Sequence, residues 1–175
     1  MRCFVACWPD PATRTHLDHA AQGLHARYPG SRRMRAENLH LTLAFIGELP
    51  QSMASEVASA MADLSVAPFA WHVDRFGRFD RAHIVWAGGP EEPRLAQLAE
   101  RVRGRLQALQ VRVDRKPFAA HVTLLRDVPA RDPTPGRPEP NLAIEPIHWP
   151  IEAARLVVSE REARGATRYR LLEPA

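Results

Sequence analysis

Two spacings of apolar residues run along the chain, and each predicts a different kind of element. Short runs or alternations of apolar residues predict strands, at 2–8, 39–46, 69–76, 82–88, 111–114, 119–126, 144–149, 153–159 and 168–173. Apolar residues three and four positions apart predict helices, at 11–28, 51–64 and 88–109.

Turn and capping residues separate these elements. Asp10 followed by Pro11 is typical of a helix start, with the aspartate as N-cap and proline in the first turn. Residues 77–81 are expected to form a turn between the strands at 69–76 and 82–88. Four prolines within 131–140 predict a loop there.

Helices and strands are interspersed without the strict alternation of a parallel sheet, which favours an α+β fold. A chain of 175 residues is long enough for one domain. We expect a single domain over 1–175 built from two lobes, roughly 1–88 and 89–175. Exchange of strands between the lobes is left open.

The composition excludes several classes of protein. No apolar run approaches the ~20 residues of a membrane span, and the apolar start at 2–8 is too short for a secretory signal, so we expect a cytoplasmic protein. Cys3 and Cys7 are too far apart along one strand for a disulfide and are expected to be reduced and buried. No cysteine and histidine spacing resembles a zinc site.

The charge is +4, and Lys116 is the only lysine, so nearly all of the positive charge is arginine. Arginine suits phosphate groups and stacks on bases, which favours a polyanionic partner such as a nucleic acid. A GC-rich genome would enrich arginine equally well, so the charge alone leaves the partner open.

A short pattern occurs twice: His40-Leu41-Thr42-Leu43 and His121-Val122-Thr123-Leu124. In a strand, the histidine and threonine of each copy share one face and the apolar residues share the other. Chance predicts roughly 0.06 copies of such an apolar-flanked pattern in this composition. Two copies therefore indicate two matching half-sites.

Two imidazoles and two hydroxyls around one small site suit displacement at phosphorus. One histidine can activate a nucleophile while the other protonates the leaving oxygen, and the hydroxyls can bind phosphoryl oxygens. Neither motif carries the further ligand of a catalytic zinc site. The chain also lacks a Walker loop, a Gly-x-Gly-x-x-Gly and a Gly-x-Ser-x-Gly. General acid and base chemistry on a phosphodiester fits best.

The chain resembles the two-histidine (2H) phosphoesterases, and within them the RNA 2′,3′-cyclic phosphodiesterases, also called 2′-5′ RNA ligases. The resemblance is carried by the opening residues 1–6, by 37–48 and 116–126 around the two motifs, by 157–160, and by Gly165 followed by Tyr169. Ala120 departs from the pattern, since the family often has proline there.

The resemblance implies a bilobal α+β fold with pseudo-twofold symmetry, antiparallel sheets lining a central cleft and helices outside. It implies hydrolysis of RNA 2′,3′-cyclic phosphate ends to 2′-phosphates without a metal or cofactor, and reversible 2′-5′ ligation. Carried over to this sequence, His40 would be the proton donor and His121 the proton acceptor. Thr42 and Thr123 would bind the phosphate.

Further candidates come from their positions near the motifs. Arg126 could touch phosphate, although strict alternation places it on the opposite face from His121 unless the strand bends. Arg33 and Arg35 could contact the RNA backbone, and Phe45 and Phe118 could stack on a base or pack in the core.

Two other functions stay open. The chain could be a 2H phosphodiesterase acting on a small cyclic nucleotide, or a non-catalytic module that binds RNA ends. The expected partner is an RNA with a 2′,3′-cyclic phosphate end, such as a tRNA fragment, or a nucleotide; we expect no membrane partner and a monomer.

Overall fold

The computed structural model describes residues 1–114, 116–129, 144–162 and 167–174. The described α-helices are α1 (Pro11–Arg27), α2 (Gln51–Ala62) and α3 (Pro93–Ala108). The described strands are β1 (Arg2–Cys7), β2 (Arg32–Arg33), β3 (Leu41–Glu48), β4 (Phe69–Val73), β5 (Arg75–Phe79), β6 (Ile84–Gly88), β7 (Val122–Arg126), β8 (Ile147–Ile151), β9 (Arg155–Arg161) and β10 (Thr167–Leu171). Short 3-10 turns lie at Ala36–Asn38 and Asp80–Ala82.

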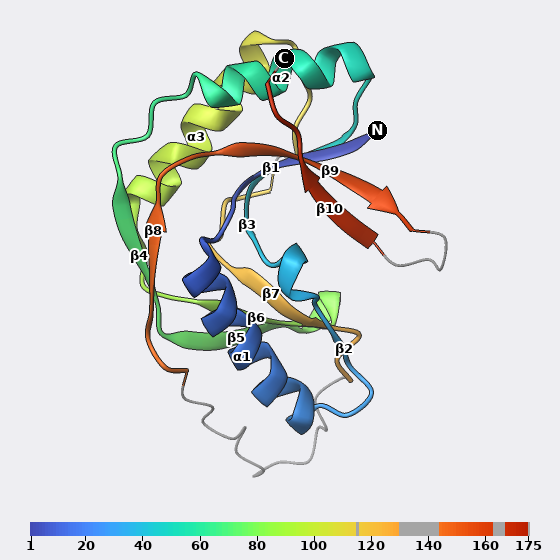
Figure 1. Ribbon diagram of the computed structural model, residues 1–175, viewed down its shortest axis with the longest axis vertical. Helices are drawn as coiled ribbons and strands as arrows, with labels where there is room; N and C mark the ends of the chain where they lie inside the picture. The colour runs from blue at the N-terminus through green and yellow to red at the C-terminus, as the bar shows by residue number, and fades with distance from the viewer. Residues whose placement is uncertain (115, 130–143, 163–166, 175) are drawn as a thin grey trace.

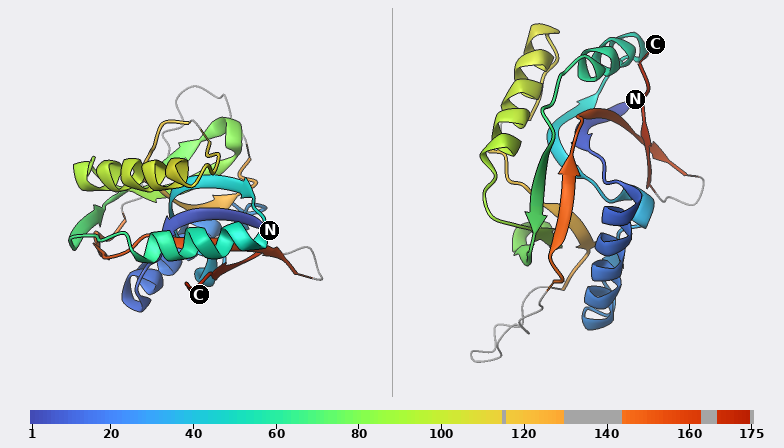
Figure 2. Two further views of the ribbon diagram at one scale, coloured as in Figure 1. Left: turned by 90° about the horizontal axis from the view of Figure 1, so that it is seen from above. Right: turned by 60° about the vertical axis from the view of Figure 1, so that its left-hand side comes forward.

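The strands form antiparallel sheets (Figures 1 and 2). One four-stranded sheet, sheet A, has the order β10-β9-β1-β3, and a second, sheet B, has the order β2-β7-β6-β5. β4 and β8 form a two-stranded sheet C. Each large sheet combines strands from the first half of the chain with strands from the second. The α+β class is confirmed.

Helices cover the outer faces of the large sheets (Figure 1). α2 packs against β9 and α3 against β3 in sheet A, while α1 packs against β7 in sheet B. The predicted start of α1 is confirmed, because the Asp10 side chain accepts hydrogen bonds from the amides of Ala12 and Thr13. Leu17, Ala21 and Leu24 form its buried face. None of the described helices is long and apolar enough to cross a membrane.

Cys3 and Cys7 are buried and free, as predicted. Burial raises the pKa of the Cys7 thiol to about 12, so this side chain stays protonated and serves as an apolar packing residue.

Three sequence expectations for the elements are wrong. The predicted turn at 77–81 is largely strand, because the chain passes at Asp74 from β4 in sheet C to β5 in sheet B and turns only at Asp80–Ala82. Gly77 is needed within β5 because the Trp86 ring, directly opposite on β6, occupies the space that a Cβ would take. Residues 111–114 form no strand. Helix α3 starts at Pro93, capped by Glu92, and not near Gly88. The predicted loop at 131–140 lies outside the described residues.

Both motif strands contain a bulge at the same place. Val5 pairs with Ala44 and Ala6 with Thr42, which leaves Leu43 without an opposite residue. Val85 pairs with Leu125 and Trp86 with Thr123, which leaves Leu124 in the same position. A bulge of one residue reverses the faces of all side chains beyond it. Phe45 and Arg126, each five positions after its motif histidine, are thereby returned to the face of the motif threonine.

Candidate active site

A cleft of about 1300 Å³ lies between sheets A and B. His40 and Thr42 line it from the start of β3, and His121 and Thr123 line it from the start of β7. Arg126 lines the same cleft because of the bulge at Leu124, so strict alternation was wrong for this residue. The structure therefore gathers both motifs and Arg126 around one space.

The two imidazole rings are held in the same way. His40 and His121 lie one residue before their strands, and the Nδ1 atom of each is 2.7 Å from a backbone carbonyl two residues earlier, that of Asn38 or Ala119. A carbonyl oxygen only accepts, so Nδ1 must carry the proton in both rings. Each neutral ring then presents its Nε2 lone pair as a base. The Nε2 of His40 lies 3.1 Å from Thr42 Oγ1, whose hydroxyl donates to it.

Aromatic side chains enclose both imidazoles. The His40 ring stacks on Trp8 at 5.9 Å between centroids, and it meets Phe4 at 4.7 Å and the edge of Tyr169 at 5.1 Å. The His121 ring meets Phe79 at 5.0 Å and Trp86 at 6.4 Å. These contacts restrict ring rotation, so the two Nε2 atoms keep their directions before a substrate binds.

The surroundings lower the pKa of both histidines. Burial lowers the pKa of His40 to about 4, and the positive charges of Arg126 and His121 act in the same direction. Burial also lowers the pKa of His121, and Arg126 adds to the effect. The hydrogen bonds to the backbone carbonyls oppose these shifts only in part. Both rings are therefore neutral at pH 7 in the ligand-free protein.

Several arginines around the cleft are paired with carboxylates. Arg33 lines the cleft but forms a close ion pair with Asp18 of α1. Arg35 lines it and pairs with Glu162 at 3.0 Å. Arg33 and Arg35 thus line the cleft with their charges already partly neutralised, and their contact with an RNA backbone stays a prediction.

The two candidate phenylalanines differ in exposure. Phe45 is 55% exposed and lies in the cleft, in contact with the Phe4 ring at 6.2 Å. Phe118 lies beside the cleft, in a smaller pocket of about 220 Å³ that Phe45, Phe79 and His121 also line. This pocket is apolar on most of its surface and opens next to the His121 ring.

The sequence pattern did not identify the aromatic side chains that hold the imidazoles, nor the role of Asn38. Among these aromatic residues, Phe4 is the one whose orientation the sequence indicates, because alternation in β1 places it on the same face as Arg2. Trp86 and Tyr169 have no spacing relation to either motif and reach the site only through strand pairing. Within the described ranges, no group of three or more histidine, cysteine, aspartate or glutamate side chains is placed to hold a metal ion.

The chain is similar in sequence to known proteins. The family described as LigT like Phosphoesterase matches residues 8–86. A protein named RNA 2′,3′-cyclic phosphodiesterase from Archaeoglobus fulgidus is 32% identical over 129 residues, covering 72% of this chain and 72% of the relative. One of the same name from Escherichia coli is 31% identical over 142 residues, covering 79% of this chain and 75% of the relative.

Solved structures agree over almost the whole chain. The crystal structure of E. coli LigT complexed with 3′-AMP superposes with a TM-score of 0.76 at 30% identity, covering 98% of this chain and 95% of LigT. The chain and LigT thus share one fold over almost their whole lengths. The chain belongs to the LigT-like phosphoesterases of the 2H superfamily.

Proposed function

We propose that the protein hydrolyses the 2′,3′-cyclic phosphate at the end of an RNA to a 2′-phosphomonoester by acid and base catalysis between His40 and His121. The observation that carries this proposal is the pair of oriented imidazoles lining the same cleft, each with a protonated Nδ1 bound to a backbone carbonyl and an unprotonated Nε2. Its relatives named RNA 2′,3′-cyclic phosphodiesterase support the choice of substrate.

In the proposed reaction, His121 Nε2 takes a proton from water as the water oxygen attacks phosphorus. The bond between phosphorus and the 3′ oxygen breaks, and His40, which also carries a proton on Nε2 in the reactive form, gives that proton to the oxygen. The product carries a 2′-phosphate and a 3′-hydroxyl. His121 ends protonated and His40 neutral, and exchange with solvent restores the starting state. In the reverse direction, a 5′-hydroxyl in place of water would form a 2′-5′ linkage.

In this proposal, three side chains bind the phosphate. The hydroxyls of Thr42 and Thr123 lie on the cleft face of their strands, two residues beyond each histidine. Arg126 adds a positive charge close enough to lower the pKa of both imidazoles. Donors fixed in advance around a non-bridging oxygen stabilise the charge that grows there in the transition state.

The cleft favours an RNA end over an isolated small nucleotide. Its size exceeds the space that one nucleotide needs, and Arg2, Arg112 and Lys116 line it in addition to Arg126. The apolar pocket at Phe118, beside exposed Phe45, offers ring faces for a base next to the phosphate. The E. coli LigT structure with 3′-AMP supports nucleotide binding by this fold.

The decisive experiment is incubation with a short oligonucleotide that ends in a 2′,3′-cyclic phosphate. We expect a 2′-monoester as the product, with unchanged turnover in excess EDTA, because the proposed proton transfers need only the two histidines. A parallel reaction with a 2′,3′-cyclic mononucleotide is expected to be slower. Equal or faster turnover of the mononucleotide would favour the small-nucleotide alternative, and binding without turnover would favour a non-catalytic RNA-end module. Loss of activity in EDTA with recovery on adding a divalent ion would contradict the metal-free mechanism.

The pH dependence of the rate follows from the lowered pKa values. The reactive form has one protonated and one neutral histidine, and in the free protein it is most populated between the two apparent pKa values of the pair. Both histidines titrate below their usual value of 6.5. We therefore expect kcat/KM to be highest below pH 6.5. The bound phosphodiester anion raises both pKa values, so the optimum of kcat should lie at higher pH. A kcat/KM optimum above pH 7.5 would contradict this assignment.

A further inference from the structure

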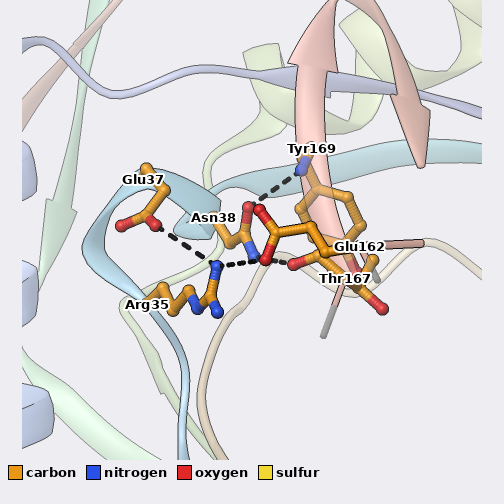
Figure 3. A network of polar contacts seen from close by, with 6 residues as sticks. All are labelled: Arg35, Glu37, Asn38, Glu162, Thr167 and Tyr169. Carbon is orange, nitrogen blue, oxygen red and sulfur yellow. Dashed lines mark hydrogen bonds and ion pairs between the residues drawn. The ribbon is translucent and has the colours of Figure 1, made fainter. Parts of the chain in front are cut away.

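Asn38 contacts both the ring of His40 and the strand that encloses it. Its backbone carbonyl accepts the Nδ1 proton of His40 at 2.7 Å. Its side-chain amide points toward β10 (Figure 3). The side-chain nitrogen donates to the carbonyl of Thr167 at 2.7 Å, and the side-chain oxygen accepts from the amide of Tyr169 at 3.0 Å.

These two hydrogen bonds are made to the outer edge of sheet A. β10 is the outermost strand of sheet A and pairs on its other side with β9. The carbonyl of Thr167 and the amide of Tyr169 therefore point away from the sheet, where a further strand would bind. The Asn38 amide satisfies both, as a strand would, and it does so while only 4% exposed. Nearby, the Arg35–Glu162 ion pair joins the segment before Asn38 to the residue that follows β9.

The strand held in this way places Tyr169 against the catalytic ring. The Tyr169 ring meets His40 edge-on at 5.1 Å and also packs on Phe4 at 5.0 Å. We propose that Asn38 is the positioning residue of His40, fixing the imidazole through its backbone carbonyl and holding β10 and Tyr169 against it through its side-chain amide. This inference rests on the proposed role of His40 in catalysis.

The position equivalent to Asn38 in the second motif is Ala119, and it shows what the backbone carbonyl does without an amide side chain. Ala119 stands at the same position before His121, and its carbonyl accepts the Nδ1 proton at the same 2.7 Å. It has no side chain that could hold a strand. Fixing Nδ1 thus needs only the backbone, and the amide of Asn38 serves the enclosure of His40 alone. An Asn38→Ala change removes the amide contacts with β10 and leaves the backbone contact with Nδ1.

The test follows the His40 ring itself. Apart from Tyr169, the titratable groups that face it are Arg126 and His121, which the change leaves in place. Without the amide bonds, β10 and Tyr169 separate from His40 and water reaches the ring. We expect the pKa of His40, measured by NMR of the imidazole, to rise by about one pH unit toward its usual value, while that of His121 stays unchanged. We expect kcat to fall about tenfold to 10²-fold with little change in KM, because the ring loses its fixed direction.

Two further variants keep the proposal falsifiable. Tyr169→Leu removes the enclosing ring and should raise the pKa of His40 in the same way, and the double variant should add little to either single change. Leu95→Ala, a buried residue of α3, lowers stability without touching the site and should leave the His40 titration unmoved. An Asn38→Ala protein that loses stability as Leu95→Ala does, with an unmoved His40 titration, would overturn the proposal. The NMR titration needs no substrate, so it remains decisive even if the protein fails to cleave a cyclic phosphate.

Discussion

Replacing either motif histidine by alanine is expected to lower kcat by about 10²–10⁴, the usual loss when a general acid or base is removed. Both rings line one cleft and bind a backbone carbonyl through a protonated Nδ1, which leaves Nε2 as the atom that exchanges a proton in each. Because the two act in one step, the double replacement should cost little more than the larger single one. Single-turnover assays on an oligonucleotide 2′,3′-cyclic phosphate measure these losses directly.

The same two variants can separate acid from base. A substrate with sulfur in place of the 3′ oxygen has a leaving group that needs no protonation. If His40 is the proton donor, this substrate should restore most of the rate of His40→Ala and leave His121→Ala slow. The reverse pattern would exchange the two roles, and equal rates for wild type and both variants on the natural substrate would reject histidine catalysis altogether. His83→Ala is a suitable control, because His83 is exposed and lies outside the cleft lining.

Periodicity predicted most of the fold because most of its elements bury one face. The alternation around His40 and the spacing of Leu17, Ala21 and Leu24 in α1 record which side chains face the core. The periodicity of apolar residues does not indicate which strands pair with one another. The passage from β4 to β5 at Asp74 keeps alternation almost unbroken while the chain changes sheets, so sequence could not reveal it.

In the site, too, the sequence indicates local patterns but not the contacts between separate strands. The two motifs could be found because each repeats a local pattern on a single strand. The enclosing residues could not, because Tyr169 meets His40, and Trp86 meets His121, only once separate strands have paired. The bulges are the clearest example. An unpaired Leu43 and an unpaired Leu124 look like ordinary apolar residues in sequence, yet they decide which later side chains reach the cleft.

Arg126 is the residue whose role depends most on such a bulge, and its replacement is expected to have the next largest effect. Arg126→Gln should lower kcat by about 10²-fold, the scale of losing one preorganised donor to the transition-state oxygen. Phe45 occupies the corresponding place on β3, so the fold supplies one cation and one exposed ring at equivalent positions. Phe45 at the equivalent position cannot supply the charge that Arg126 loses.

Arg126→Lys distinguishes charge from geometry. Lysine keeps the charge but lacks the planar fork that holds two phosphate oxygens, so a partial recovery would indicate that both matter.

Arg32 provides the matched control, since it lies directly opposite Arg126 on β2 but is paired with Asp127 at 2.9 Å on the exposed rim. Arg32→Gln should change kcat less than about threefold and act mainly on KM for longer RNA, because an exposed paired cation contributes little to a fixed site. Removing Arg126 also removes a positive charge that lowers the pKa of both imidazoles. Both pKa values should therefore rise, and the kcat/KM optimum should move to higher pH. A rate and pH profile unaffected by Arg126→Gln would show that the bulge at Leu124 serves only the packing of sheet B.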